Sequence, residues 1–247
     1  MRPRHEWDAV RALAAVHLND CEVASRTGIP RSTVREWRLR PVPPGSARRD
    51  DPKLCAMCHG APVDEAAYGY LLGLYLGDGC VSQDRRGLFR LRVVLDLRYP
   101  RIIEACAAAM GAVGPRPAGI QRYAAKNYAE VHLGWKHWPC LLPQHGAGRK
   151  HLRTIELAPW QRHIVQVDPA PLLRGLIHSD GCRFDNKVKG NAYPRYQFTN
   201  TSQDIRGIFC WACDLYGVRW RQSGPRTISV SRRADVAKLD LVVGPKR

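Results

Sequence analysis

The stretch "LLGLYLGDGC" at residues 71–80 is nearly repeated at residues 173–182 as "LRGLIHSDGC". The two segments align without a gap when Gly73 is placed on Gly175. This alignment superposes Leu74 on Leu176, Asp78 on Asp180, Gly79 on Gly181 and Cys80 on Cys182. A repeat of this kind predicts two structurally equivalent halves.

The residues downstream of each segment match as well. A strand hairpin follows in both halves, then a helical stretch at 101–113 or 207–218, and then a strand at 129–135 or 227–233. We therefore predict an α+β fold in which tandem αββαββα repeats, at residues 64–160 and 161–247, are related by pseudo-symmetry.

The strands alternate between apolar and polar residues, as strands with one buried face do. In "LFRLRVVLDL" (88–97), Phe89 and every second residue to Leu97 are apolar, and Arg90, Arg92 and Asp96 fall on the other face. In "RYQFTN" (195–200), Tyr196 and Phe198 separate from the polar residues Arg195, Gln197, Thr199 and Asn200. Arg, Gln and Thr on a sheet surface suit phosphates and base edges, so these faces are candidate DNA-binding surfaces. A merely solvated sheet face is the alternative.

The repeated segments predict two helices that pack closely. Gly73 and Gly77 stand four residues apart, as do Gly175 and Ser179, so each helix carries a stripe with almost no side chain. Both helices are expected to end at the Asp-Gly pairs, where glycine can adopt the left-handed conformation.

An aspartate is unfavourable at a helix C-terminus, and a second carboxylate nearby makes ionisation of either one harder. A hard divalent cation such as Mg²⁺ removes that conflict, and the predicted metal site comprises Asp78, Gly79, Asp180 and Gly181. Alternatively, each aspartate only caps a turn.

The N-terminal region has a separate pattern. Residues 1–38 carry short helical segments interrupted by "GIP", the spacing of a helix-turn-helix DNA-binding domain. Its last helix would turn Val34 and Trp37 to the core, and would present to a major groove Arg31, Ser32, Thr33 and Arg35. A three-helix bundle that touches no DNA is the alternative. Residues 39–63 are rich in proline at first and are predicted to be a linker with a CxxC motif.

Charge and cysteine content restrict the partners and the compartment. The 247 residues carry a formal net charge of +17, which favours a polyanion, here double-stranded DNA. No apolar run is long enough for a membrane span. The nine cysteines are expected to be reduced thiols. We therefore expect the protein in a bacterial cytoplasm, and on the nucleoid when it is bound to DNA. Within "CAMCH", the residues Cys55, Cys58 and His59 have zinc-ligand spacing, but no second pair follows nearby. Cys210 and Cys213 are expected in the core, and Cys80 and Cys182 in a tight space beyond the helix ends.

Both repeated segments resemble the signature helix of the single-chain LAGLIDADG homing endonucleases, with the last Asp and Gly of the motif at 78–79 and 180–181. The resemblance covers residues 64–247. It implies a saddle of two antiparallel sheets over DNA, motif helices at the interface, motif acids as metal ligands, and a monomer. The chain departs from the motif at Leu76 and at His178, which is expected to be a packing residue.

The resemblance also implies a basic residue near the metals. The candidates are Arg149 and Lys150 in the first half and Lys246 and Arg247 in the second, and Lys150 is preferred as a catalytic residue beside Asp78 and Asp180. Simple phosphate contact by Lys150 is the alternative.

These patterns leave three functions open. The first is a site-specific, metal-dependent double-strand DNA endonuclease. The second is a non-cleaving transcriptional regulator that uses the same fold to bind DNA. The third is an intron RNA maturase, which has the same charge and fold.

Overall fold

The computed structural model describes residues 4–39, 54–85 and 87–244. It divides into two compact units, Met1–Asp51 and Pro52–Arg247, which are described separately. The chain therefore enters its second unit a few residues before Cys55.

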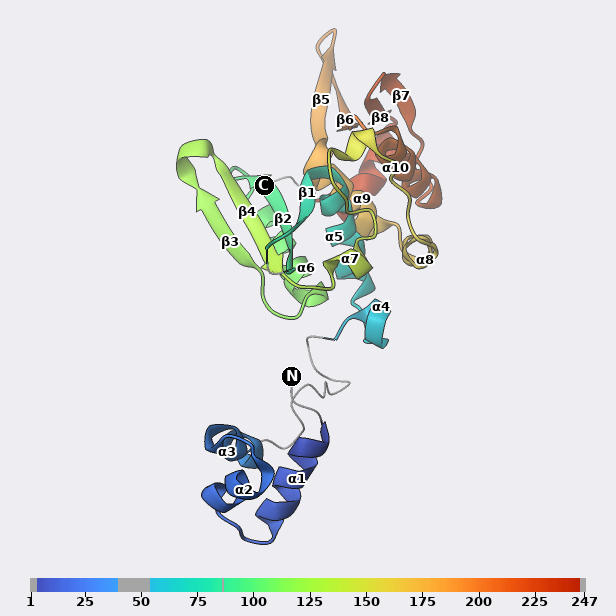
Figure 1. The fold of residues 1–247 in the computed structure, drawn as a ribbon. Helices are drawn as coiled ribbons and strands as arrows, with labels where there is room; N and C mark the ends of the chain where they lie inside the picture. Colours follow the sequence, from blue (N-terminus) through green and yellow to red (C-terminus); the bar gives the residue numbers. More distant parts are fainter. Residues whose placement is uncertain (1–3, 40–53, 86, 245–247) are drawn as a thin grey trace. The chain divides into compact units, whose positions relative to one another are not determined.

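The first unit is a three-helix bundle made of α1 (Arg4–Ala15), α2 (Asp20–Thr27) and α3 (Arg31–Leu39) (Figure 1). Asn19 caps α2, because its side chain accepts hydrogen bonds from the backbone N–H groups of Cys21 and Glu22. The core comprises Val10, Val23, Ile29, Val34 and Trp37. Val34 and Trp37 are buried as predicted.

The second unit contains two four-stranded antiparallel sheets with the same strand order, β1-β2-β4-β3 and β5-β6-β8-β7 (Figure 1). The first half contains α4 (Ala56–His59), α5 (Glu65–Asp78), β1 (Gly79–Gln83), β2 (Phe89–Asp96), α6 (Pro100–Val113), β3 (Gly119–Tyr123), η1 (Ala124–Lys126), β4 (Tyr128–Gly134) and α7 (Trp138–Leu141). A connecting segment with η2 (Lys150–Leu152) and α8 (Pro159–Val167) follows. The second half contains α9 (Ala170–Asp180), β5 (Gly181–Val188), β6 (Asn191–Thr199), α10 (Gln203–Leu215), β7 (Arg221–Gly224), β8 (Thr227–Val230) and α11 (Arg233–Val243). The predicted α+β class and the tandem repeat of helices and strand pairs are confirmed.

Two expected boundaries were wrong. The helix expected at 207–218 starts earlier, at Gln203, because the Ser202 side chain caps it by accepting from the Ile205 N–H. The strand expected at 227–233 ends at Val230, and Arg233 already begins α11. In both places the boundary was set by the start of a helix, α10 at Gln203 and α11 at Arg233, which the residue periodicity did not indicate.

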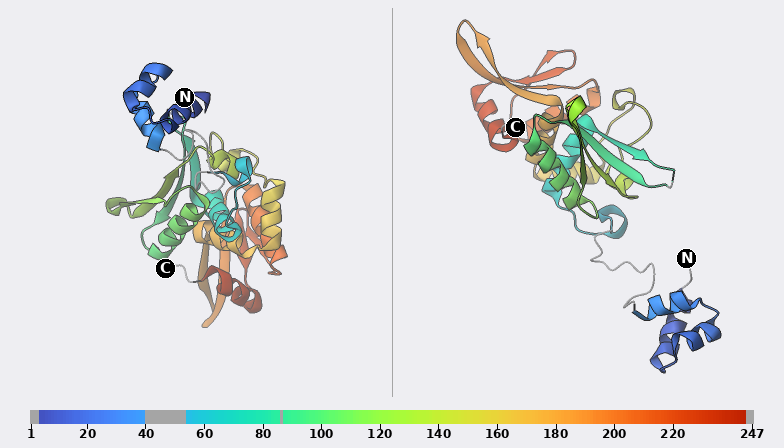
Figure 2. Two further views of the ribbon diagram at one scale, coloured as in Figure 1. Left: turned by 90° about the horizontal axis from the view of Figure 1, so that it is seen from below. Right: turned by 90° about the vertical axis from the view of Figure 1, so that its left-hand side faces the viewer.

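Each sheet has one buried and one open face, as the alternation predicted. Leu91, Val93 and Leu95 in β2 and Tyr196 and Phe198 in β6 are all buried. The helices gather against these buried faces, and the other face of each sheet is left without a helical layer (Figure 2). The polar residues of β2 and β6 lie on the uncovered faces.

The central pair of helices, α5 and α9, joins the two halves through glycine. A Cβ added to Gly73 would lie 2.6 Å from the carbonyl oxygen of Leu172 and 2.8 Å from the Cα of Gly175. A Cβ on Gly175 would overlap the carbonyl oxygen of Tyr70. The backbones therefore approach so closely that side chains at these two positions are excluded, as the small-residue stripe predicted.

The glycines after the two helices have another role than the one expected. Gly79 has φ −89° and Gly181 has φ −104°, so both are extended and neither adopts the left-handed conformation. A Cβ on Gly79 would lie 2.5 Å from the Cα of Tyr75, and one on Gly181 would lie 2.7 Å from the Cα of Ile177. Glycine is needed here because the first residue of each following strand packs directly against the last turn of the preceding helix, where a side chain would not fit.

None of the helices in residues 4–39, 54–85 and 87–244 combines the length and the apolar character that crossing a membrane requires.

Candidate active site at the ends of the central helices

The two aspartates of the repeated motif are the last residues of α5 and α9. The close packing of these helices brings their C-terminal ends together, and a Cβ on Gly77 would lie 3.0 Å from Oδ2 of Asp180. Asp78 is exposed and Asp180 is partly buried. A pocket of about 430 Å³ opens beside them, lined by the end of α5, the start of β1, the connecting segment at 146–153 and the 199–201 turn.

Asp180 is oriented by Asn200, a residue that sequence reasoning assigned to the polar sheet face. The Asn200 Nδ2 donates a 2.5 Å hydrogen bond to Oδ2 of Asp180. Asn200 is itself held by the turn after β6, because its Oδ1 accepts from the Ser202 N–H at 2.7 Å. β6 ends at Thr199, so Asn200 lies in the following turn and not on the strand. Because the predicted alternation was extended to Asn200, it placed this side chain on the sheet face and did not indicate the contact with Asp180.

Lys150 lies at the C-terminal end of α5. Its ammonium donates to the carbonyl oxygens of Tyr75, Leu76 and Gly77, the latter two at 2.9 Å. These carbonyls lie in the last turn of α5, where they carry the negative end of the helix dipole, and the Tyr75 carbonyl also accepts from the Gly79 N–H. The structure thus brings Lys150 to the two aspartates, although the three are far apart in sequence.

Burial lowers the pKa of Lys150 to about 8, although the negative charges of Asp180 and Asp78 act in the opposite direction. An ammonium has three N–H donors, and all three have carbonyl acceptors here. In this arrangement Lys150 neutralises the helix end and places a positive charge near both carboxylates. A direct hydrogen bond from Lys150 to a phosphate requires the release of one carbonyl.

The donor groups of this site suit a hard divalent cation. Asp78 and Asp180 supply carboxylate oxygens, the ligand type that Mg²⁺ and Ca²⁺ prefer. Within the described ranges no third His, Cys, Asp or Glu joins them to form a ligand cluster. Because Mg²⁺ commonly keeps several waters and takes further ligands from a substrate phosphate, two carboxylates fit such an ion.

The open face of the first sheet carries Arg90 on β2, which is exposed, and Arg92, whose side chain is 40% exposed. Nη1 of Arg92 lies 3.8 Å from one carboxylate oxygen of Glu130, and Nδ1 of His132 lies 3.7 Å from the other. The positive charge of Arg92 is thus partly offset by Glu130 on β4.

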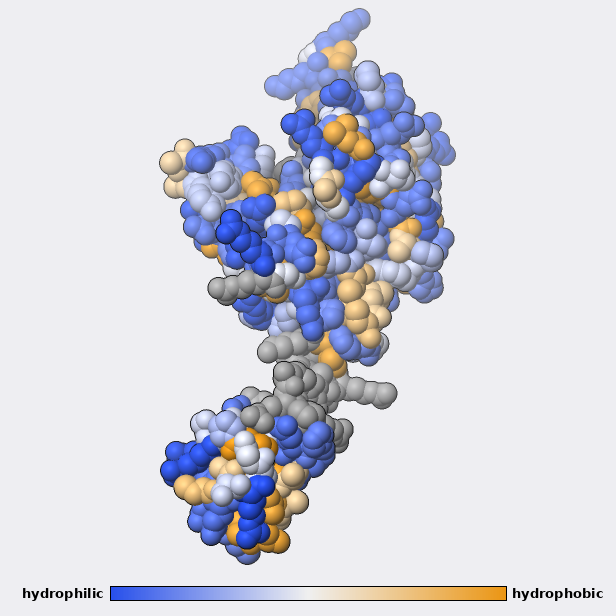
Figure 3. Space-filling view, in the orientation of Figure 1, coloured by the Kyte–Doolittle hydropathy of each residue, from blue (hydrophilic) through white to orange (hydrophobic). Residues whose placement is uncertain are grey.

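The open face of the second sheet carries Arg195, Gln197 and Thr199 on β6. Thr199 shares a 3.2 Å hydroxyl contact with Thr227 of β8, and the Nε of Arg195 is buried without a hydrogen-bond partner. Hydrophilic residues dominate the visible surface of the second unit, with isolated hydrophobic ones between them (Figure 3).

In the first unit, the residues assigned to base reading lie on the outer side of α3. Arg31, Ser32 and Arg35 are exposed and Thr33 is partly buried. Arg38 is tied by a 2.5 Å ion pair to Asp20 of α2 and is therefore part of the bundle.

The structure corrects one pair of other assignments and confirms several more. Cys80 and Cys182 are exposed, so they do not fill a tight space, whereas Cys210 and Cys213 are buried as expected. His178 is buried and contacts the Tyr70 hydroxyl and the Val243 carbonyl, as expected of a packing residue. Arg149 is exposed, and Lys246 and Arg247 lie outside the described residues.

The predicted zinc ligands are only partly brought together. The Nδ1 of His59 accepts a hydrogen bond from the Cys55 N–H, so His59 is not part of the metal-ligand cluster. Cys55 and Cys58 instead meet His137 and Cys140. The second pair was missed because it lies far along the chain, with Cys140 82 positions after Cys58.

No protein-family model matches the sequence, and neither does any curated protein. Among solved structures, the chain is similar to I-DmoI in complex with DNA and Ca, with 15% identity, 73% of this chain and 91% of that chain covered, and a TM-score of 0.47. It is similar to the LAGLIDADG meganuclease I-AabMI bound to uncleaved DNA, with 14% identity, coverage of 70% and 81%, and a TM-score of 0.44. It is also similar to the N-terminal LAGLIDADG domain of DUF199/WhiA, with 11% identity, coverage of 81% and 92%, and a TM-score of 0.47. At these identities and TM-scores the similarity says nothing about the chemistry of the site.

Proposed function

We propose that this protein is a site-specific, divalent-metal-dependent double-strand DNA endonuclease. The observation that supports this best is the convergence of Asp78, Asp180 and the partly buried Lys150 at the packed ends of α5 and α9. Carboxylates at the negative end of two helices are unfavourable, and a pure DNA-binding surface gains nothing from acids that face phosphates.

In this proposal the residues divide the work. Asp78 and Asp180 hold the metal, with Gly79 and Gly181 letting the strands begin directly at the site, and Asn200 orients Asp180. A bound divalent ion supplies Lewis-acid stabilisation of a phosphoryl oxygen and activates water. Lys150 positions the end of α5 and offsets part of the carboxylate charge while no DNA is bound.

The open sheet faces and the first unit bind the duplex in this proposal. Arg90, Arg92, Arg195, Gln197 and Thr199 contact phosphates and base edges, and α3 of the first unit reads an adjoining sequence with Arg31, Ser32, Thr33 and Arg35. A monomer with two pseudo-equivalent halves matches the two strands of a duplex.

A non-cleaving DNA-binding regulator is the second candidate. Two observations favour it: the helical unit with exposed arginines on α3, and the Asn200–Asp180 hydrogen bond, which occupies a carboxylate oxygen in the absence of metal.

One experiment separates these candidates. Full-length protein is incubated with a plasmid library of randomised sites, with Mg²⁺ and with EDTA, and the ends are sequenced. The endonuclease gives Mg²⁺-dependent double-strand ends at one recurrent sequence. Enrichment of a bound sequence that is left intact at every Mg²⁺ and Mn²⁺ concentration supports the regulator. Stronger binding to structured RNA than to that duplex supports a maturase.

A further inference from the structure

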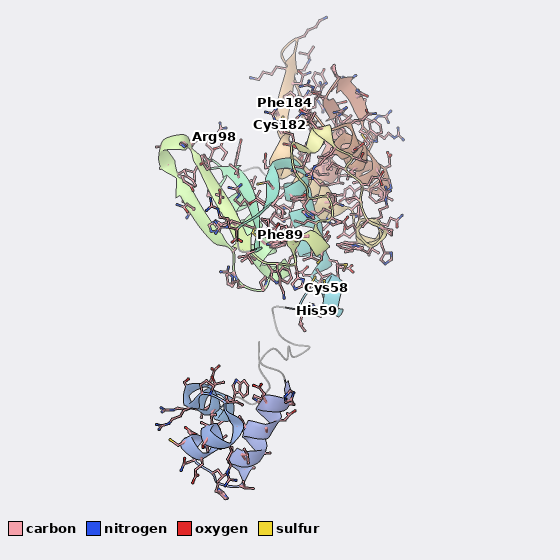
Figure 4. The ribbon with its side chains drawn as sticks, viewed as in Figure 1. Cys58, His59, Phe89, Arg98, Cys182 and Phe184 are labelled. Carbon is pink, nitrogen blue, oxygen red and sulfur yellow. The ribbon has the colours of Figure 1, made fainter. Side chains whose placement is uncertain are left out.

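Three cysteines and one histidine meet at the opposite end of the second unit from β5. The candidate ligand atoms of Cys55, Cys58, His137 and Cys140 all lie within 4.8 Å of one another. Figure 4 shows Cys58 and His59 on α4, far from Cys182 and Phe184 on β5. The cluster is therefore separate from the strand that leaves the proposed active site.

The spacing of the ligand atoms suits a tetrahedral ion. The sulfur atoms of Cys58 and Cys140 are 3.2 Å apart, and the Cys140 sulfur is 3.8 Å from Nδ1 of His137. A tetrahedral zinc ion with Zn–S bonds of about 2.3 Å separates two sulfurs by about 3.8 Å, so small shifts of the exposed Cys58 suffice. A disulfide requires about 2.05 Å between the sulfurs, and these two are separate thiols.

The polar atoms of the cluster are poorly satisfied by the protein. Nε2 of His137 is buried without a hydrogen-bond partner, and its Nδ1 contacts the Cys140 sulfur at 3.8 Å. Buried polar groups normally have partners, and an ion that binds the imidazole gives this ring a strong one.

Local structure presents the ligands in two matched pairs. Cys55 is the N-cap of α4 and Cys58 lies on that helix, while His137 is the N-cap of α7 and Cys140 lies on that helix. In each pair the second ligand follows the first by three residues, so one short helical turn places both on the same side. Three sulfurs and one imidazole form a closed ligand set that suits structural zinc.

We propose that Cys55, Cys58, His137 and Cys140 bind a structural Zn²⁺ ion that fastens α4 to α7. The Tyr68 hydroxyl of α5 donates a 2.6 Å hydrogen bond to the carbonyl of Leu141 in α7. The ion thus links the point where the chain enters the second unit to the central helix that carries Asp78. This site has no part in cleavage.

The test is the metal content of the full-length protein, purified without a metal-affinity tag and measured by plasma mass spectrometry. We expect about one zinc per chain in the wild type and in Asp78→Asn, because the two metal sites are independent. We expect His137→Gln and Cys140→Ser to lose this zinc. The matched controls His59→Gln and Cys21→Ser should retain it, since neither residue belongs to the cluster.

Cobalt titration of the zinc-free wild type keeps the proposal testable if the ligand variants do not fold. We expect the intense visible bands of tetrahedral, thiolate-bound cobalt and a rise in Tm on metal addition. Zinc-free native protein with an octahedral cobalt spectrum would overturn the proposal. So would a Cys58–Cys140 disulfide found by mass spectrometry of freshly lysed cells, or zinc that survives His137→Gln and is lost in His59→Gln.

Discussion

The two halves of the second unit share their backbone plan and differ in their polar chemistry. Asp78 and Asp180 end equivalent helices, and each is followed by an extended glycine in contact with the helix's last turn. Asp78 is exposed beside a helix end that is capped by Lys150, whereas Asp180 is partly buried and held by Asn200. The comparison shows that the pseudo-symmetry is kept in the backbone packing of the two helix ends, whereas the side chains that contact the two aspartates differ.

The strongest test of equivalence removes one carboxylate at a time. Asp78→Asn and Asp180→Asn should each lower double-strand cleavage by roughly 10³-fold, because losing a metal ligand removes several kcal/mol of transition-state stabilisation. Binding to the same duplex in Ca²⁺ should change little. Cleavage rates of linear duplex under single-turnover conditions measure the effect.

Asp185→Asn is the matched control, since Asp185 is exposed on β5 and pairs with Arg183 at 3.9 Å. Its cleavage should stay within about twofold of wild type. If one motif variant cuts both strands at the wild-type rate, the two aspartates are not a functional pair.

The backbone contact between the halves is tested by adding one methyl group. Gly175→Ala should lower the free energy of unfolding by about 3 kcal/mol or more, because its Cβ would overlap the Tyr70 carbonyl oxygen and neither backbone can move away. Urea unfolding followed by circular dichroism measures this.

Gly207→Ala, within helix α10, is the control, because nothing lies within 4 Å of an added Cβ there. It should leave the stability unchanged or raise it by up to about 1 kcal/mol. Equal effects of the two substitutions would contradict the close approach of α5 and α9.

The core and the contact between the central helices could be predicted from the sequence, whereas part of the candidate site could not. The alternation in β2 and the small-residue stripe located the core and the helix contact, because both follow from period and size. Asn200 and His137 were missed because their roles depend on a turn geometry and on a pairing across the chain. The prediction that Gly79 adopts the left-handed conformation was wrong. Glycine is favoured both where two backbone segments approach closely and where φ is positive, and the sequence alone does not distinguish these two requirements.

Lys150 sharpens the comparison through pH. Its folded-state pKa is about 8, below the ordinary value of 10.5, so between these pH values the unfolded chain holds a proton that the folded chain has released. Below pH 8 the ammonium is charged in both states, and the cost of burying it lowers the stability of the folded chain in full. The free energy of unfolding should therefore rise by up to about 3 kcal/mol from pH 8 to pH 10.5.

Lys150→Met removes the titrating group and should flatten this rise, which parallel urea titrations at several pH values will show. It should also reduce cleavage about 10²-fold, while a substitution of exposed Arg149 by Met has little effect on the pH dependence. An unchanged pH profile in Lys150→Met would show that another group causes it.

The smallest expected effect concerns the two sheet faces. Removing one arginine that contacts a phosphate should reduce the slope of log affinity against log salt by about 0.9. Arg195→Ala should show that full change, and Arg92→Ala a smaller one, because Glu130 already lies 3.8 Å from its guanidinium. Affinity across a salt series on cognate and scrambled duplexes measures both. If Glu130→Gln does not increase the contribution of Arg92, the pairing has no influence on DNA binding.

The position of Lys150 in the chain restricts where residues can be inserted or deleted between the two repeats. The residue lies on the segment that connects the two repeats, between α7 and α8. Exposed connections of this kind ordinarily accept inserted residues at little free-energy cost. Here the connection carries Lys150, whose side chain must reach three carbonyls of α5, so the length of the connection between α7 and Lys150 is constrained by the site. A protein built from two copies of the second repeat would lack this lysine and its contacts with the last turn of α5.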